Sequence, residues 1–197
     1  MPVSIIVAHP NPNSFTHALA QGVCQTLKSI NKPFYLHDLY AEGFDPLLPA
    51  PEISRIAALP ALIQRHCDEI AVAQGIVIIH PNWWGMPPAI LAGWVDRVMR
   101  PGVAYEFLEG DNGEGVPHGL LKIKSAVVFN TGNTKMEREL KVFGDPLQRI
   151  WKDCVFGLCG ATHFRRKLFE TIVTSTLEQR QKWLAEAGRI ILEEFNR

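Results

Sequence analysis

The chain has 197 residues, of which 47% are hydrophobic, and this is enough to bury the core of one ordinary globular domain. Its 20 Lys and Arg residues balance its 20 Asp and Glu residues, so the formal net charge is zero. A main partner made of nucleic acid is therefore excluded, since neutralising phosphates needs a basic surplus. No apolar run approaches the roughly 20 residues that span a bilayer, and the first residues lack a signal-peptide pattern. We expect a cytoplasmic protein that is not an integral membrane protein.

Short apolar runs alternate with helical patterns along the chain. Val3–Ala8 predicts a first strand, and the polar stretch His9–Ser14 leads from it into a helix with one apolar face. Pro33–His37 predicts a second, weaker strand at an edge of the sheet. A helix is expected over Ile53–Ala73, with an interruption near Pro60 because proline breaks the helical hydrogen bonds.

The third strand carries the clearest signal. Gly75–His80 contains an unbroken apolar run, which is typical of a strand buried on both faces. Pro81–Met86 follows it with two adjacent tryptophans and a glycine, and Pro87 and Pro88 then open a helix. The glycine-rich segment Pro101–Leu121 is expected to be a long loop without secondary structure of its own, a kind of loop that is usually functional.

A fourth strand is predicted at Ser125–Asn130, and it leads into the glycine- and hydroxyl-rich stretch Thr131–Thr134. The next helix is expected to begin at Pro146 with Asp145 as its N-cap. Cys154 falls on the apolar face of this helix, which predicts a core position.

The last two elements are a weakly signalled strand, His163–Phe169, and a helix with an apolar stripe, Leu177–Phe195. Five strands thus alternate with helices, which predicts one α/β domain over residues 1–197, with a parallel sheet and helices on both faces. In the strand order 2-1-3-4-5, the loops after the first, third and fourth strands would meet at one edge of the sheet.

Each of these three loops offers a ligand something different. His9–Thr16 opens a helix whose free amides favour an anion, aided by the hydroxyls of Ser14 and Thr16, and no GxGxxG or P-loop lysine is present. Pro81–Met86 offers indole rings, and Thr131–Thr134 offers hydroxyls and an amide. A cofactor with a phosphate at one end and a planar heteroaromatic ring at the other would use all three, and flavin fits that description.

Seven short motifs also follow one another along the chain. They are Ala8-His9-Pro10, Asp38-Leu39-Tyr40, Pro81-Asn82-Trp83-Trp84-Gly85-Met86-Pro87, Leu91-Ala92-Gly93-Trp94, Ala104-Tyr105-Glu106-Phe107, Asn130-Thr131-Gly132 and Gly144-Asp145-Pro146. The set resembles the flavodoxin-like NAD(P)H:quinone oxidoreductases, a family that includes the ancillary reductases of potassium-efflux systems. The resemblance runs from Val3 to about Gly160, and the double-tryptophan motif is its most specific part. It implies a flavodoxin-like three-layer fold.

By this resemblance we expect an enzyme that passes hydride from NADPH or NADH through a flavin to a quinone or similar acceptor, in a ping-pong reaction. FAD is the implied cofactor, with FMN as the alternative. The implied flavin-binding residues are His9, Ser14, Phe15, Thr16, Pro81, Asn82, Trp83, Trp84, Gly85, Thr131, Gly132 and Asn133. Tyr105 and Phe107 would lie over the substrate pocket, contributed to the partner's site in a homodimer. The family's proton-relaying histidine is replaced by Phe143 here.

Two other function classes stay open from the sequence. One is a flavin-binding regulatory subunit of a membrane transporter such as a potassium-efflux system. The other is a one-electron carrier like flavodoxin, although such carriers are usually strongly acidic for docking and this chain has no net charge. No spacing of cysteines and histidines predicts a metal site, and no GxSxG elbow predicts a serine nucleophile.

Overall fold

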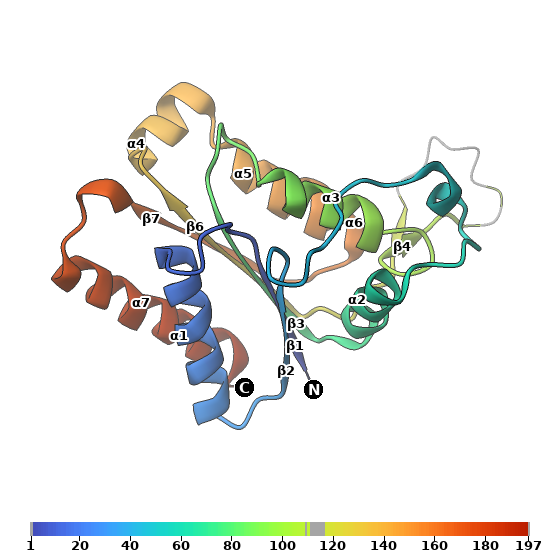
Figure 1. The fold of residues 1–197 in the computed structure, drawn as a ribbon, viewed down its shortest axis with the longest axis horizontal. Helices are drawn as coiled ribbons and strands as arrows, with labels where there is room; N and C mark the ends of the chain where they lie inside the picture. Colours follow the sequence, from blue (N-terminus) through green and yellow to red (C-terminus); the bar gives the residue numbers. More distant parts are fainter. Residues whose placement is uncertain (1, 109, 111–116, 197) are drawn as a thin grey trace.

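The computed structural model of the chain describes residues 2–108, 110 and 117–196. A five-stranded parallel sheet forms the middle layer, and helices cover both of its faces (Figure 1). The strands are Val3–Val7 (β1), Phe34–Asp38 (β2), Gly75–Pro81 (β3), Ser125–Gly132 (β6) and Phe164–Glu170 (β7). Their order across the sheet is β2-β1-β3-β6-β7, which confirms the predicted order 2-1-3-4-5 for these five strands.

Helices follow the strands in the predicted alternation. The α-helices are Phe15–Ser29 (α1), Ala61–Val72 (α2), Ala89–Val98 (α3), Met136–Arg138 (α4), Pro146–Arg149 (α5), Gly157–Cys159 (α6) and Leu177–Phe195 (α7). Short 3-10 helices lie at Ala50–Ile53 (η1) and Ile172–Thr174 (η4), and π-helical segments lie at Glu139–Phe143 (η2) and Ile150–Phe156 (η3). None of the described helices is both long enough and apolar enough to cross a membrane.

Two hydrophobic cores lie on opposite faces of the sheet. Helices α1 and α7 cover one face, where Leu19 and Ile191 pack with strand residues such as Ile5 (Figure 1). Helices α2, α3 and η3 cover the other face and bury Trp94 and Trp151 completely. Because both faces are covered, every residue of β3 is buried, and this is why that strand has an unbroken apolar sequence.

The helix predicted over Ile53–Ala73 exists only after the proline. Helix α2 begins at Ala61, and Pro60 lies just outside it with an extended backbone, ψ 145°. A proline inside the helix would lack its N–H donor and clash with the preceding turn. The residues before Pro60 therefore form an irregular connection that starts with η1.

The prediction of a loop without secondary structure over Pro101–Leu121 is wrong where the structure describes this segment. Tyr105–Glu106 (β4) pairs antiparallel with His118–Gly119 (β5), while residues 109 and 111–116 lie outside the described residues. The ribbon packs tightly on α6, since a Cβ atom on Gly119 would lie 2.4 Å from the backbone carbon of Cys159. Backbone pairing and this close approach give the segment an order that its composition does not predict.

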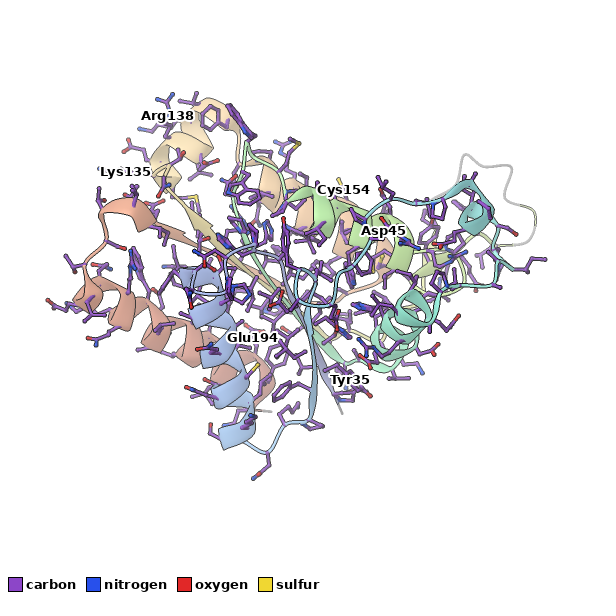
Figure 2. All side chains as sticks on the ribbon, viewed as in Figure 1. Tyr35, Asp45, Lys135, Arg138, Cys154 and Glu194 are labelled. Atoms are coloured by element: carbon purple, nitrogen blue, oxygen red, sulfur yellow. The ribbon has the colours of Figure 1, made fainter. Side chains whose placement is uncertain are left out.

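Cys154 is exposed, so its predicted core position is also wrong (Figure 2). The helix that carries it is π-helical over η3, where the fully buried Trp151 and Phe156 are five residues apart. An α-helical repeat would turn Cys154, three residues after Trp151, toward the core. The wider π-turn turns it toward solvent instead.

Candidate functional site

The carboxyl ends of β1, β3 and β6 lie side by side, because these strands are neighbours in the sheet. The segments that follow them are in contact. The Thr16 and Thr131 hydroxyl oxygens are 3.1 Å apart, and the Asn82 amide donates to the Thr131 carbonyl at 2.7 Å. The His9 and Trp83 ring centroids are 6.0 Å apart. The three predicted loops thus meet at one edge, although Pro81, Thr131 and Gly132 end the strands rather than lie in loops.

The first segment presents backbone donors at the start of α1. Ser14 caps this helix by accepting a hydrogen bond from the His17 amide at 3.3 Å. The first-turn amides of Phe15 and Thr16 have no partner within the helix, as in any α-helix. The Phe15 side chain lies in the core against Phe169 and Trp183, so only its backbone faces a ligand at this edge.

His9 lies in the same segment, before α1. Its Nδ1 atom accepts a hydrogen bond from the Asn11 amide at 3.0 Å. Burial lowers the pKa of His9 below its ordinary value, and the neighbouring His17 lowers it further, against the opposing effect of the Asn11 hydrogen bond. A neutral His9 can therefore serve an anion through its Nε2–H donor rather than through charge.

The two tryptophans lie on a tight turn that exposes them. Trp84 and Gly85 both have left-handed backbone conformations, with φ of 57° and 71°, and the Trp83 and Met86 backbones exchange two hydrogen bonds around them. The side-chain oxygen Oδ1 of Asn82 accepts from the Gly85 amide at 3.0 Å. Trp83 is 41% exposed and Trp84 is 96% exposed. A bulky residue rarely adopts positive φ, and such strain is concentrated at functional sites.

The third segment begins with Thr131 and Gly132 at the end of β6 and continues through Asn133. Thr131 is buried against Thr16, while the Asn133 side-chain oxygen accepts from the Val173 amide at 3.0 Å and so holds η4. The polar groups left at this edge are backbone amides, the Asn133 side-chain nitrogen and the side chain of Thr134, which follows Asn133.

A cavity of about 390 Å³ opens between the second and third segments. We call it the ring cavity, and its lining residues are Asn82, Trp84, Gly85, Asn133, Thr134, Glu139, Phe143 and Pro146. Sequence reasoning missed Glu139, which is buried and accepts a hydrogen bond from the Asn82 side chain at 3.1 Å. Glu139 occurs in a strongly charged run that has the composition of a solvent-exposed face, so no sequence signal marks it.

Tyr105 and Phe107 lie away from the ring cavity. Their ring centroids are 5.8 Å apart, and both residues line a separate apolar cavity of about 430 Å³ between β4 and the helices α3 and η3. None of the residues that line this second cavity lines the ring cavity. Within one chain, therefore, these two aromatic residues do not complete the site formed by the three segments.

A buried hydrogen-bond network surrounds His80, near the end of β3. His80 Nδ1 donates to the Pro81 carbonyl at 2.8 Å, and His80 Nε2 accepts from Trp151 and from Asn130, both at 2.9 Å. Burial lowers the pKa of His80 to about 3, so the ring is neutral. Both ring nitrogens are occupied by structural hydrogen bonds, so His80 positions the strand end.

Asp145 is not the side-chain cap that the sequence predicts. It precedes α5 with φ of 48°, and its side chain caps no amide there. Its Oδ2 atom instead accepts from Arg166 at 2.7 Å, and Arg166 also donates to Asn130 at 2.6 Å. Both members of the ion pair are buried, so the carboxylate bonds the guanidinium rather than the helix.

A family model for the flavodoxin-like fold matches residues 1–193 of this chain. The chain belongs to the flavodoxin-like family. The Haemophilus influenzae protein named uncharacterized NAD(P)H oxidoreductase is 35% identical over 173 residues, which cover 85% of this chain and 83% of that protein. The predicted fold class and the resemblance to NAD(P)H:quinone oxidoreductases are confirmed.

Solved structures of the flavodoxin-like family superpose on almost the whole chain. The NAD(P)H:quinone oxidoreductase of Methanothermobacter marburgensis matches with a TM-score of 0.82 at 24% identity, and the match covers 97% of this chain and 95% of that protein's chain. The FMN-dependent NADH-azoreductase of Bacillus anthracis in complex with FMN matches with a TM-score of 0.76 at 15% identity, and the match covers 98% of this chain and 99% of that chain. At these identities the likeness shows the shared fold.

This flavodoxin-like protein also contains a cluster of His37, Glu42 and His66 whose ligand atoms lie close enough to hold a metal ion. Trp94 donates its indole N–H to His66 Nδ1 at 3.0 Å, which places the His66 proton on Nε2, where it donates to Glu42. A metal on Nε2 would force that proton onto Nδ1, against the indole donor. His37 lies between the carboxylates of Glu42 and Glu69, so the cluster satisfies its own hydrogen bonds.

Proposed function

We propose that this protein is a flavin-dependent NAD(P)H oxidoreductase that reduces a quinone or a similar acceptor in the cytosol. The observation that carries the proposal is the contact between the ends of β1, β3 and β6 beside an open cavity bordered by Trp84. Amide donors lie at one end of this edge and an exposed aromatic turn lies at the other. That separation suits a ligand with a phosphate at one end and a planar ring at the other.

The chain's own residues would bind and orient the flavin. His9, Ser14 and the first-turn amides of Phe15 and Thr16 would hold the phosphate and the ribityl chain. The ring would lie along Pro81–Gly85 and Thr131–Asn133, where backbone N–H dipoles can stabilise negative charge at its edge. When bound, the flavin supplies the two-electron redox chemistry. The nicotinamide and the acceptor would then occupy the ring cavity in turn, which gives ping-pong kinetics.

The replacement of the family's histidine by Phe143 changes what the ring cavity can do. Phe143 is half exposed and lines that cavity, where it offers an apolar surface and no proton. Hydride transfer does not require a side-chain acid at this position, because backbone dipoles can hold the reduced ring. We propose that the acceptor takes its proton from water and that Phe143 favours an apolar quinone.

We assign FMN rather than FAD as the cofactor. The family resemblance implies FAD, but the structurally similar azoreductase of Bacillus anthracis is in complex with FMN. FAD would need a further site for the adenosine monophosphate unit that it has in addition to FMN. FMN needs only the three segments described above.

The test starts from the purified protein. We expect it to be yellow, to release FMN on heating, and to lose its colour on anaerobic addition of NADPH or NADH. A soluble quinone should restore the colour, and double-reciprocal plots should give the parallel lines of a ping-pong reaction. The released cofactor is identified by mass, which decides between FMN and FAD. A colourless protein that takes up neither flavin contradicts the proposal, and a coloured protein without quinone turnover supports a regulatory flavin subunit instead.

We further propose a homodimer in which Tyr105 and Phe107 complete the partner's site. Phe107 is 48% exposed in the single chain, beside an apolar cavity that no described residue fills. Sedimentation equilibrium should give twice the mass of the chain. The substitution Phe107→Asp should yield a monomer that keeps its FMN and loses most of its quinone turnover. A wild-type monomer with full activity would refute the proposed homodimer.

A further inference from the structure

We propose that a basic cavity beside the ring cavity binds the 2′-phosphate of NADPH, so that the protein uses NADPH in preference to NADH. The basic cavity is lined by Lys135, Arg138 and Lys141, together with Glu137 and the shared residues Asn133 and Thr134. This inference rests on the proposed function, since it assigns the nicotinamide ring to the ring cavity.

The two cavities are adjacent at the end of β6. Asn133 and Thr134 line both of them, so one extended ligand can reach from the ring cavity into the basic cavity. The basic cavity has a volume of about 470 Å³, and Lys135 before α4 and Arg138 at its last position lie at the outer edge of the molecule (Figure 2). A dinucleotide with its nicotinamide on the flavin would extend its adenosine half in this direction.

The charge of the basic cavity differs from that of the chain. The whole sequence has no net charge, yet the cavity wall has three cations and one carboxylate. Lys141 is paired with Glu137 at 2.8 Å. Lys135 and Arg138 make no ion pair with any described residue, so two positive charges remain for a ligand. A phosphate monoester with close to two negative charges is the matching ligand.

Arg138 is held at the boundary of the two cavities. Its guanidinium lies over the ring of Phe143 at 5.4 Å, and Phe143 lines the ring cavity. This cation–π contact limits the side-chain freedom that Arg138 would lose on binding a phosphate. The lining of the ring cavity has one acidic side chain, Glu139, and no basic side chain that could pair with a phosphate. The phosphate is therefore favoured in the basic cavity and disfavoured next to the flavin ring.

The test compares both nicotinamides on the flavin-loaded protein. We expect the wild type to have at least tenfold higher kcat/KM for NADPH than for NADH. In the double variant Lys135→Ala/Arg138→Ala this preference should disappear through a higher KM for NADPH, while kcat/KM for NADH changes less than threefold. A matched variant, Arg149→Ala/Lys152→Ala, removes two exposed cations of the following helix that do not line the cavity, and it should keep the preference.

A second measurement decides the phosphate site without turnover. Titration calorimetry should show 2′,5′-ADP binding at least tenfold more tightly than 5′-AMP to the wild type and equally to the double variant. Equal binding in the wild type, or a preference that survives the double variant, overturns the inference. A protein that oxidises neither nicotinamide but still binds 2′,5′-ADP through these residues contradicts the proposed function alone.

Discussion

Replacing Arg97 by methionine is expected to lower the free energy of unfolding by about 3–5 kcal/mol, because it leaves a buried carboxylate without its cation. Arg97 and Glu52 are 4% and 6% exposed and form a bidentate pair, with Nη2–Oε1 and Nε–Oε2 distances of 2.5 and 3.0 Å. Arg97 also donates to the Asp45 carbonyl at 2.6 Å. Urea denaturation of the flavin-loaded protein at neutral pH measures the loss.

Two further variants separate the ion pair from other causes. The double variant Arg97→Met/Glu52→Leu should recover most of the lost stability, because it removes both buried charges together. Lys182→Met breaks the exposed Lys182–Glu178 pair of α7 and should change the unfolding midpoint little. If the double variant is as unstable as Arg97→Met, the cost comes from lost packing rather than from the stranded carboxylate.

The Arg97–Glu52 ion pair links the irregular segment before α2 to α3, the helix that follows the tryptophan turn. Arg97 lies in the last turn of α3 and Arg100 lies two residues after the helix, where it donates to the carbonyls of Glu52 and Ser54 at 2.8 and 2.7 Å. Nearby, Gly93 packs so closely that a Cβ atom would lie 2.1 Å from the Pro46 carbonyl oxygen. The proline-rich connection before α2 is thus held against α3 by side-chain hydrogen bonds and close packing, in addition to its own local hydrogen bonds.

The second large effect is expected at Gly85, where Gly85→Ala should weaken flavin binding at least tenfold. Its backbone has φ of 71°, and an added Cβ would lie 2.7 Å from the ring of Pro146. To relieve the backbone strain and the contact with Pro146, the turn that presents Trp84 must move away from α5. The wall of the ring cavity then moves with the turn. Fluorescence titration of the flavin-free protein with FMN measures the change.

Gly43→Ala is the matched control, because Gly43 has a similar φ of 63° but no atom within 4 Å of an added Cβ. Both substitutions should destabilise the fold by about 1–2 kcal/mol through the left-handed backbone alone. Only Gly85→Ala should change FMN affinity. Equal FMN affinity in the two variants would show that the turn does not shape the flavin site.

Much of the architecture could be read from local patterns. The strand order and the meeting of three segments follow from apolar runs, from prolines that end them, and from the connection rules of α/β sheets. The break expected near Pro60 is present, but no helix forms over residues 54–60 before it, and α2 begins at Ala61. The core position predicted for Cys154 is wrong because the π-helical turn departs from the 3.6-residue repeat on which that prediction depended.

The sequence by itself determined the class of fold, the edge of the sheet that carries the site, and the turn with the two tryptophans, because periodicity, proline and glycine act on neighbouring residues. Only the tertiary structure decided which polar groups are buried and with which partners. Glu139 bonds Asn82 and Glu52 bonds Arg97, although each pair is far apart in the sequence. The sequence does not distinguish a charged residue on the solvent-exposed surface from one in a buried ion pair. Tertiary packing determines which of the two environments the side chain occupies, and therefore how much of its hydration it loses.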